Sequence, residues 1–155
     1  MATLGKKKLS IKSSVLVLGK LDTDVLENQD IFVRKMSIRD AENIRKKRME
    51  IYGDVFELSN KAEQAKQSGN DEIAEEISIE IDELFESKSE QSAILMAEVI
   101  CFSLCDENGT LQFDADDVDS VLSLPSDVIS DWYNKILKMN AIDTKDEGAA
   151  EQIKN

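Results

Sequence analysis

The side chains that could do chemistry are two cysteines and many carboxylates, because the chain contains no histidine. Without histidine the usual general base is missing, and Ser-His-Asp and Cys-His catalysis are impossible. Cys101 and Cys105 are four residues apart, so on a helix they share a face. Their spacing is not the Cys-x-x-Cys redox pattern, and two thiols alone do not complete a structural zinc site. We therefore expect both cysteines to be buried and reduced.

The segment around Asn108-Gly109 predicts one of two structures. An Asn-Gly pair readily takes the positive backbone angles of a tight hairpin turn, and Leu111-Gln112-Phe113 alternates like a short strand. The alternative is a calcium loop with the ligands Asp106, Asn108, Thr110, Asp114 and Asp117. That loop needs a glycine where Leu111 stands and a bidentate glutamate where Asp117 stands. We predict the hairpin.

Carboxylates dominate the charge, since 32 acidic and 19 basic residues give a net charge of −13. Residues 1–50 hold 12 basic and 7 acidic side chains, whereas residues 51–155 hold 7 basic and 25 acidic ones. The acidic total argues against general binding to a phosphate backbone. The opposite signs of the two parts favour head-to-tail self-association or a basic partner, and the alternative is a set of solvated helix faces.

Two clusters of charge lie on predicted helices. The basic run Arg45–Arg48 has only Tyr52 as a nearby aromatic residue, so we interpret it as a solvated or partner-facing helix edge. Carboxylates cover much of the segment Glu72–Glu86. Acid–base catalysis needs a pocket that separates two carboxyl pKa values, and a repeat along an exposed face provides none. We therefore predict a protein without catalytic residues, cofactor or metal.

The fold that must position these groups is predicted to be α+β, with a small N-terminal antiparallel β-sheet, a mainly helical body and one β-hairpin. Alternation and β-branched residues predict strands at Leu9–Ile11, Val15–Leu18 and Ile31–Val33. Connections this short favour antiparallel pairing. Ser37 is the predicted N-cap of a helix that carries the basic run and stops at Gly53.

The middle of the chain is predicted to contain three helical segments. Residues 54–70 are polar and indicate a mobile helix followed by a turn. An amphipathic helix with an isoleucine stripe begins at Asp71. A separate helix over residues 93–102 is apolar nearly all round and should be the buried centre.

Beyond the hairpin, a Leu-Pro break separates two further predicted helices. Asp114, with Asp117 three residues later, caps the first, and Ser126 caps the second. The second carries a continuous apolar stripe: Val128, Ile129, Trp132, Tyr133, Ile136 and Leu137. Its two aromatic residues are core residues or interface anchors.

Residues 1–142 are predicted to form a single domain, and residues 143–155 a flexible polar tail. The apolar runs are far shorter than the roughly 20 residues that span a bilayer. The N-terminus lacks an apolar stretch of signal-peptide length, so we expect a cytosolic protein. Four methionines would supply adaptable contacts if exposed: Met36, Met49, Met96 and Met139.

Two separate blocks of sequence carry a family pattern. The first, Asp30–Ala41, is a strand that runs into a capped helix. The second is the hairpin Leu104–Asp114, followed by the Leu124-Pro125 break and a helix that ends Ile136-Leu137-Lys138-Met139-Asn140. Together they resemble the tail assembly chaperones of long-tailed bacteriophages. In that family the second block typically has a Cys/Val-Asp-x-x-Gly hairpin and a Leu-Asn helix end, whereas this chain has one extra residue before its glycine and Met-Asn at the end.

The resemblance implies a non-virion chaperone of the host cell cytoplasm that binds and solubilises the tape measure protein. It also implies recruitment of tail tube protein, through a frameshift-extended form in many members, and a homo-oligomer, with neither nucleic acid nor membrane as a partner. The binding surfaces of this chain are predicted at its charged clusters and last helix: Arg45, Lys46, Arg48, Glu72, Glu75, Glu76, Glu80, Glu83, Trp132, Tyr133 and Met139.

An acidic nucleic-acid mimic that inhibits a host DNA-binding enzyme is the alternative function. Such a mimic needs carboxylates spaced like phosphates, and the stripe from Glu72 to Glu86 is the candidate. Reversing its charge should abolish mimicry but only weaken a chaperone.

Overall fold

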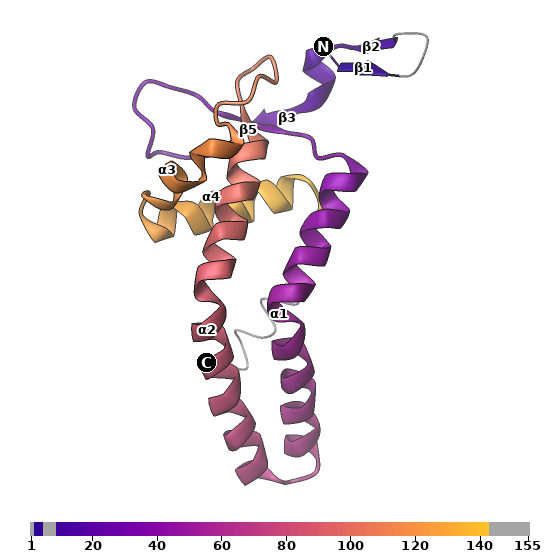
Figure 1. The fold of residues 1–155 in the computed structure, drawn as a ribbon, viewed down its shortest axis with the longest axis vertical. Helices are drawn as coiled ribbons and strands as arrows, with labels where there is room; N and C mark the ends of the chain where they lie inside the picture. Colours follow the sequence, from indigo (N-terminus) through magenta and orange to yellow (C-terminus); the bar gives the residue numbers. More distant parts are fainter. Residues whose placement is uncertain (1, 5–8, 143–155) are drawn as a thin grey trace. The chain divides into compact units, whose positions relative to one another are not determined.

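The structure is a computed structural model that describes residues 2–4 and 9–142, and the predicted tail, residues 143–155, lies outside the described part (Figure 1). The chain is mainly helical with small antiparallel sheets, so the predicted α+β class is confirmed. It divides into two compact units. Unit 1 comprises the described residues up to Ala41 together with Ile94–Ile142, and unit 2 comprises Glu42–Ala93. The two long helices each contribute to both units.

Unit 1 contains two antiparallel sheets. Strands β1 (Ala2–Leu4) and β2 (Leu9–Ile11) pair with each other. The second sheet has the strand order β3, β4 and β5, with the bounds Val17–Lys20, Phe32–Arg34 and Leu104–Cys105. In its centre Val33 pairs with Leu104, and both side chains are fully buried. Strand β4 therefore connects the N-terminal part of the chain to a segment that follows both long helices.

The predicted strand Leu9–Ile11 is confirmed as β2, and the strand predicted at Ile31–Val33 lies one residue later, as β4. The prediction missed β1, and β3 starts and ends two residues later than predicted. The segment predicted as strand Val15–Leu18 begins as a short 3-10 helix, Ser13–Leu16, and β3 starts only at Val17. Val15 is 51% exposed, so the first apolar residue of the run has no core to pack against. Strand geometry starts at Val17 because that residue is the first to pair with β4, opposite Arg34.

Helix α1 (Ile38–Gln67) begins where the sequence predicts but does not stop at Gly53. Ser37 Oγ accepts the backbone N–H of Asp40 at 3.0 Å, which confirms the predicted N-cap. The predicted stop is wrong because Tyr52 and Val55, on either side of the glycine, are both buried in unit 2. This packing outweighs the cost of glycine in a helix, which is about 1 kcal/mol. The mobility predicted for residues 54–70 stays a prediction.

Replacing Gly53 with alanine should raise the free energy of unfolding by about 0.5–1 kcal/mol, because alanine loses less backbone entropy in a helix. The added Cβ would lie 3.4 Å from Met49 Sδ, an ordinary contact with a flexible side chain. Urea denaturation followed by circular dichroism measures the change. Ala65→Gly on the same helix is the control and should lower the free energy of unfolding. A lower free energy of unfolding in Gly53→Ala would contradict the prediction.

Helix α2 (Asp71–Ser103) is one continuous helix where the sequence predicts two. The tight connection from α1 turns at Gly69, whose φ is +74°, and the Asn70 N–H donates to the Ala65 carbonyl at 2.8 Å. The separate start predicted near residue 93 is wrong because the polar segment before it, Ser87–Ser92, contains no glycine or proline to end a helix.

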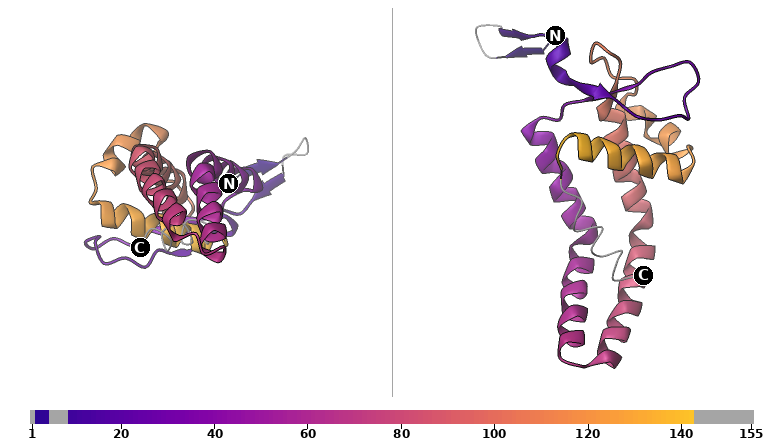
Figure 2. Two further views of the ribbon diagram at one scale, coloured as in Figure 1. Left: turned by 90° about the horizontal axis from the view of Figure 1, so that it is seen from below. Right: turned by 180° about the vertical axis from the view of Figure 1, so that it is seen from behind.

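Unit 2 is an antiparallel pair formed by Glu42–Gln67 of α1 and Asp71–Ala93 of α2, which lie side by side in both Figure 1 and Figure 2. Val55 and Ile81 are fully buried at its centre. Partly buried side chains pack against them: Phe56, Leu58, Ile77, Leu84 and Phe85. The hydroxyls of Tyr52 and Ser92 share a hydrogen bond that links the two helices.

The predicted hairpin is present as a chain reversal, but its second strand is a single bridge between Cys105 and Leu111. The Asp106 N–H donates to the Thr110 carbonyl at 2.9 Å, which closes the turn. Of the Asn-Gly pair only Gly109 has a positive φ, +85°. The Asp106 carboxylate holds the wider loop by accepting the N–H groups of Asn108 and Thr110 at 2.8 and 3.0 Å.

Unit 1 is completed by a 3-10 turn (Ala115–Asp117) and the helices α3 (Val118–Leu122) and α4 (Ser126–Met139). The Asp114 N–H donates to Asp117 Oδ2 at 2.7 Å, which confirms the predicted cap. The N-cap of α4 is Pro125, one residue before the predicted Ser126. The apolar stripe of α4 faces the core, as predicted, through Ile129, Trp132, Tyr133, Ile136 and Leu137.

The end of α4 is tied to the start of α1. Asn140 Oδ1 accepts the backbone N–H of Met36 at 2.9 Å, across a sequence separation of 104 residues. Just beyond it, Ala141 has a φ of +56°, and the Ile142 N–H donates to the Leu137 carbonyl at 2.9 Å. The Ala141 N–H also donates to the Lys138 carbonyl at 3.0 Å, so α4 ends in a Schellman cap with alanine where glycine is usual. The last helix of unit 1 is thereby fixed to the link between β4 and α1.

Candidate functional site

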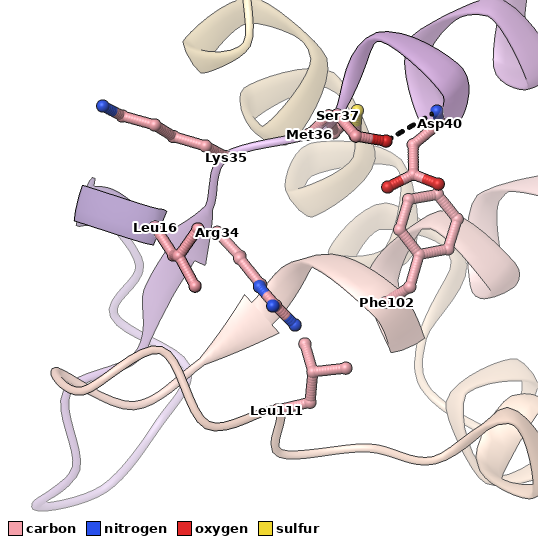
Figure 3. Close-up of a pocket in the computed structure, with 8 residues that line it drawn as sticks. All are labelled: Leu16, Arg34, Lys35, Met36, Ser37, Asp40, Phe102 and Leu111. Atoms are coloured by element: carbon pink, nitrogen blue, oxygen red, sulfur yellow. Dashed lines mark hydrogen bonds between the residues drawn. The ribbon is translucent and has the colours of Figure 1, made fainter. Parts of the chain in front are cut away.

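A cavity of about 330 Å³ opens in unit 1 beside the start of α1 (Figure 3). Five segments of the chain supply its walls: the 3-10 helix before β3, the end of β4 with the link that follows, the first turn of α1, the end of α2, and the loop after β5. The lining residues are Leu16, Arg34, Lys35, Met36, Ser37, Asp40, Phe102 and Leu111. We call this feature the Arg34 cavity. Sequence reasoning missed it because no local pattern shows that these segments meet.

Arg34 gives the cavity its chemistry. Figure 3 shows its side chain reaching into the cavity toward Leu111 and Phe102, whereas Lys35 points away. Within the described part of the chain, the Arg34 guanidinium makes no ion pair and no hydrogen bond. An unpaired guanidinium beside apolar walls suits a group that carries a carboxylate next to an apolar side chain.

The two cysteines are free and buried, as the sequence predicts. Burial raises the pKa of Cys101, and the charges of Asp117 and Glu98 raise it further. Burial also raises the pKa of Cys105, helped by Asp106 and opposed by Arg34. Because the thiolate is the reactive form, neither side chain has the character of a nucleophile.

The raised cysteine pKa values predict a loss of stability in alkali. Unfolding lets each thiol ionise at its ordinary pKa of about 8.5, so stability is complete below that pH and falls as the pH rises toward the folded-state pKa. Urea denaturation at several pH values between about 7 and 10 measures this decline. A variant with both cysteines replaced by alanine should show a shallower decline. An identical pH dependence in the two proteins would contradict the prediction.

The charged residues predicted to bind a partner lie on α1 and α2 in unit 2. Arg45 and Lys46 are exposed on α1, and Arg45 pairs with Glu42 at 2.6 Å. Arg48 is only 7% exposed, so it packs inside and does not offer its charge to a partner. The predicted glutamates all lie exposed on α2: Glu72, Glu75, Glu76, Glu80 and Glu83.

Ile79 is a surface residue that the sequence analysis missed. Its side chain is 56% exposed on α2, and every residue at helical spacing three, four or seven from it is acidic. The ring around it consists of Glu72, Glu75, Glu76, Asp82, Glu83 and Glu86. No basic side chain in the described residues pairs with any of these six carboxylates. We call these seven residues the Ile79 patch, which a count of neighbours at those spacings would have revealed.

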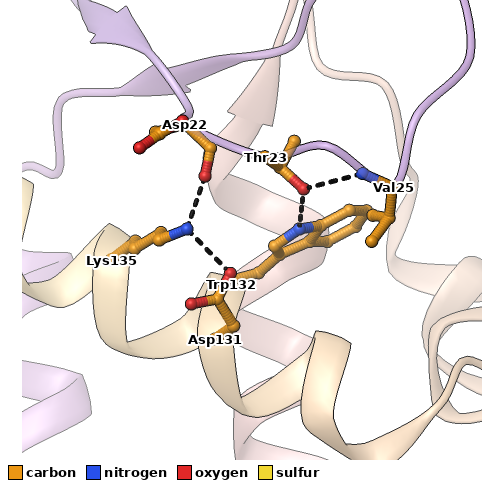
Figure 4. A network of polar contacts seen from close by, with 6 residues as sticks. All are labelled: Asp22, Thr23, Val25, Asp131, Trp132 and Lys135. Carbon is orange, nitrogen blue, oxygen red and sulfur yellow. Dashed lines mark hydrogen bonds and ion pairs between the residues drawn. The ribbon is translucent and has the colours of Figure 1, made fainter.

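Trp132 and Tyr133, predicted as core residues or interface anchors, are 3% and 1% exposed. Figure 4 shows how Trp132 is held: its Nε1–H donates to Thr23 Oγ1 at 3.2 Å. One turn further along α4, Lys135 binds Asp131 at 2.9 Å and the Asp22 carbonyl. The hydrogen bond that Lys135 donates to the Asp131 carboxylate raises the pKa of Lys135. These contacts fasten α4 to the segment after β3.

Met139, the last predicted binding residue, is half-buried in unit 1. Its Cε lies 3.8 Å from the position that a Cβ on Gly19 would occupy. The predicted site residues are therefore not gathered in one place: the aromatic pair and Met139 belong to unit 1, and the charged residues belong to unit 2.

In the residues that the structure describes, no three histidine, cysteine or acidic side chains are grouped to hold a metal ion. The described residues also contain no helix long and apolar enough to cross a membrane. Comparison of the chain with protein-family models, curated proteins and solved structures finds no match.

Proposed function

We propose that this chain is a non-catalytic tail assembly chaperone that binds and solubilises a phage tape measure protein in the host cell cytoplasm. It would help to recruit tail tube protein, through a frameshift-extended form if one is made, and would not enter the mature virion. The proposal begins from the two sequence blocks that resemble this family, and one structural observation supports it.

That observation is that the two blocks pack against each other. β4 of the first block pairs with β5 of the second, with Val33 opposite Leu104. The Met36 N–H of the first block donates to Asn140 at the end of the second. Separate blocks that recur in one family and meet in one core are what a shared fold would require. A chance resemblance between two short segments gives no reason for them to meet.

The exposed apolar side chains of the long helices also fit a binding role. Met49 on α1 and Ile73 on α2 are 56% and 45% exposed in unit 2. Scattered apolar side chains on an acidic surface can cover the apolar faces of another protein's helices while charge repulsion keeps the chaperone dispersed.

Co-expression with a candidate tape measure protein tests the proposal. We expect most of the tape measure protein to move from the pellet to the supernatant and to co-purify with this chain. Met49→Asp with Ile73→Asp should reduce that rescue, and Asp54→Asn with Glu63→Gln is a control that changes exposed polar residues of α1. If no candidate tape measure protein from the same genome is rescued, the proposal fails.

A second candidate function, the acidic nucleic-acid mimic, is favoured by the carboxylates of the Ile79 patch, none of which pairs with a basic side chain of the described residues. A surface that imitates phosphates needs no exposed isoleucine among its carboxylates, so Ile79 weakens this alternative. Inhibition of a host DNA-binding enzyme that is lost in Glu76→Lys with Glu83→Lys, but kept in Ile79→Ala, would establish the mimic.

A further inference from the structure

We propose that the Arg34 cavity of one copy of this chain receives the Ile79 patch of a second copy. The inference goes beyond the proposed function and does not rest on it, because it concerns only how copies of this chain contact each other. It follows from two surfaces that are complementary in charge and that both include apolar side chains.

The Arg34 cavity lacks an anion. Its guanidinium has no ion pair or hydrogen bond within the described residues, and Leu16, Phe102 and Leu111 supply apolar wall around it. Asp40 also lines the cavity, but Figure 3 shows its carboxylate beside Ser37 and Phe102, on the α1 side. An occupant must therefore bring both an apolar group and a carboxylate.

The Ile79 patch offers both of these groups on a rigid helix. Ile79 stands at the centre, and carboxylates one turn away, at Glu76 and Glu83, project from the same face. The isoleucine exposes apolar surface to water, and the six acids around it repel acidic proteins. The patch is complementary to the Arg34 cavity, whose wall is apolar and whose guanidinium is positive.

Charge complementarity identifies a second copy as the occupant. The cavity belongs mainly to the part of the chain in which basic residues outnumber acidic ones, 12 to 7 over residues 1–50. The patch belongs to the part in which acidic residues outnumber basic ones, 25 to 7. Because the cavity and the patch are different surfaces, the contact is heterologous, and a pair of copies keeps one free cavity and one free patch. Copies would therefore add head to tail into a ring or filament.

Sedimentation velocity of the full chain tests the contact, at about 50 mM and about 500 mM salt. We expect concentration-dependent assemblies at low salt that dissociate at high salt. Arg34→Glu should weaken association by at least about 30-fold, because it removes the guanidinium and adds a like charge. Arg34→Gln should weaken it less, and guards against misfolding in the first variant. Glu76→Lys with Glu83→Lys should weaken association similarly, whereas Asp54→Lys with Glu63→Lys, the same charge change on exposed α1 positions, should weaken it little.

Mixing the variants gives the sharpest outcome. Arg34→Glu keeps a working patch, and Glu76→Lys with Glu83→Lys keeps a working cavity, so the mixture should associate more tightly than either variant alone. A wild-type chain that stays monomeric at low salt, or a mixture that associates no more tightly than either variant alone, would overturn the proposal. Equal weakening by the control pair would also overturn it, since the attraction would then be general. None of these results depends on a tape measure protein being solubilised.

Discussion

Replacing Trp132 with alanine should lower the free energy of unfolding by about 3–5 kcal/mol. The indole is 3% exposed, and its removal deletes a large buried surface from α4 and leaves a cavity. It also leaves Thr23 Oγ1 without the N–H that it accepts at 3.2 Å. Because the chain has a single tryptophan, urea denaturation of the variant must be followed by circular dichroism instead of fluorescence.

Two controls separate packing from hydrogen bonding. Trp132→Phe keeps much of the apolar volume and loses the N–H, so the hydrogen-bond part of its cost should be about 1 kcal/mol. Lys138→Ala changes an exposed residue of the same helix and should shift stability by no more than about 0.5 kcal/mol. If Trp132→Ala kept full stability but lost binding to a partner, the side chain would be an interface anchor, contrary to its burial.

The second large effect is expected in unit 2, where Ile81→Ala should lower the free energy of unfolding by about 2–5 kcal/mol. Ile81 and Val55 are the fully buried pair at the centre of the two helices, and a helix pair has few other contacts with which to compensate. Loss of helical signal on heating or in urea measures the change.

Ile79 provides a matched control two residues away on α2. Ile79→Ala deletes the same atoms from a side chain that is 56% exposed, so the change should stay within about 0.5 kcal/mol. Both variants should be compared at about 500 mM salt, where association between copies is screened. Equal losses in the two variants would mean that the core of unit 2 is not centred on Ile81.

Local patterns predicted those parts of the fold that local energies decide. The Ser37 cap and the apolar stripe of α4 were correctly predicted because one hydrogen bond and one helical period specify them. Gly53 was misread because the packing of its neighbours, which the sequence does not display, exceeds the small cost of a glycine. The 3-10 helix at Ser13–Leu16 was missed because strand geometry depends on where β4 begins to pair.

Of the two candidate surfaces, one could have been predicted from local sequence and the other could not. The Ile79 patch lies on one helix, and counting neighbours at spacings of three, four and seven would have identified it from sequence alone. The Arg34 cavity could not be identified in that way, because five separate segments build it. That Arg34 reaches into the cavity depends on the register between β4 and β5, which only the folded chain fixes.

Because β4 pairs with β5, the central sheet of unit 1 cannot be completed until the ribosome has synthesised both long helices. Ribosomes add about 5–20 residues per second, so β5 follows β4 out of the ribosome by roughly 4–14 s. Helices form in about a microsecond, so the α1–α2 pair can assemble while the first strands still wait for β5. During that wait the edge of β4 is open to any other strand, including that of a neighbouring nascent chain. Slow translation beyond Arg34 would lengthen the exposure, and rapid translation up to Cys105 would shorten it.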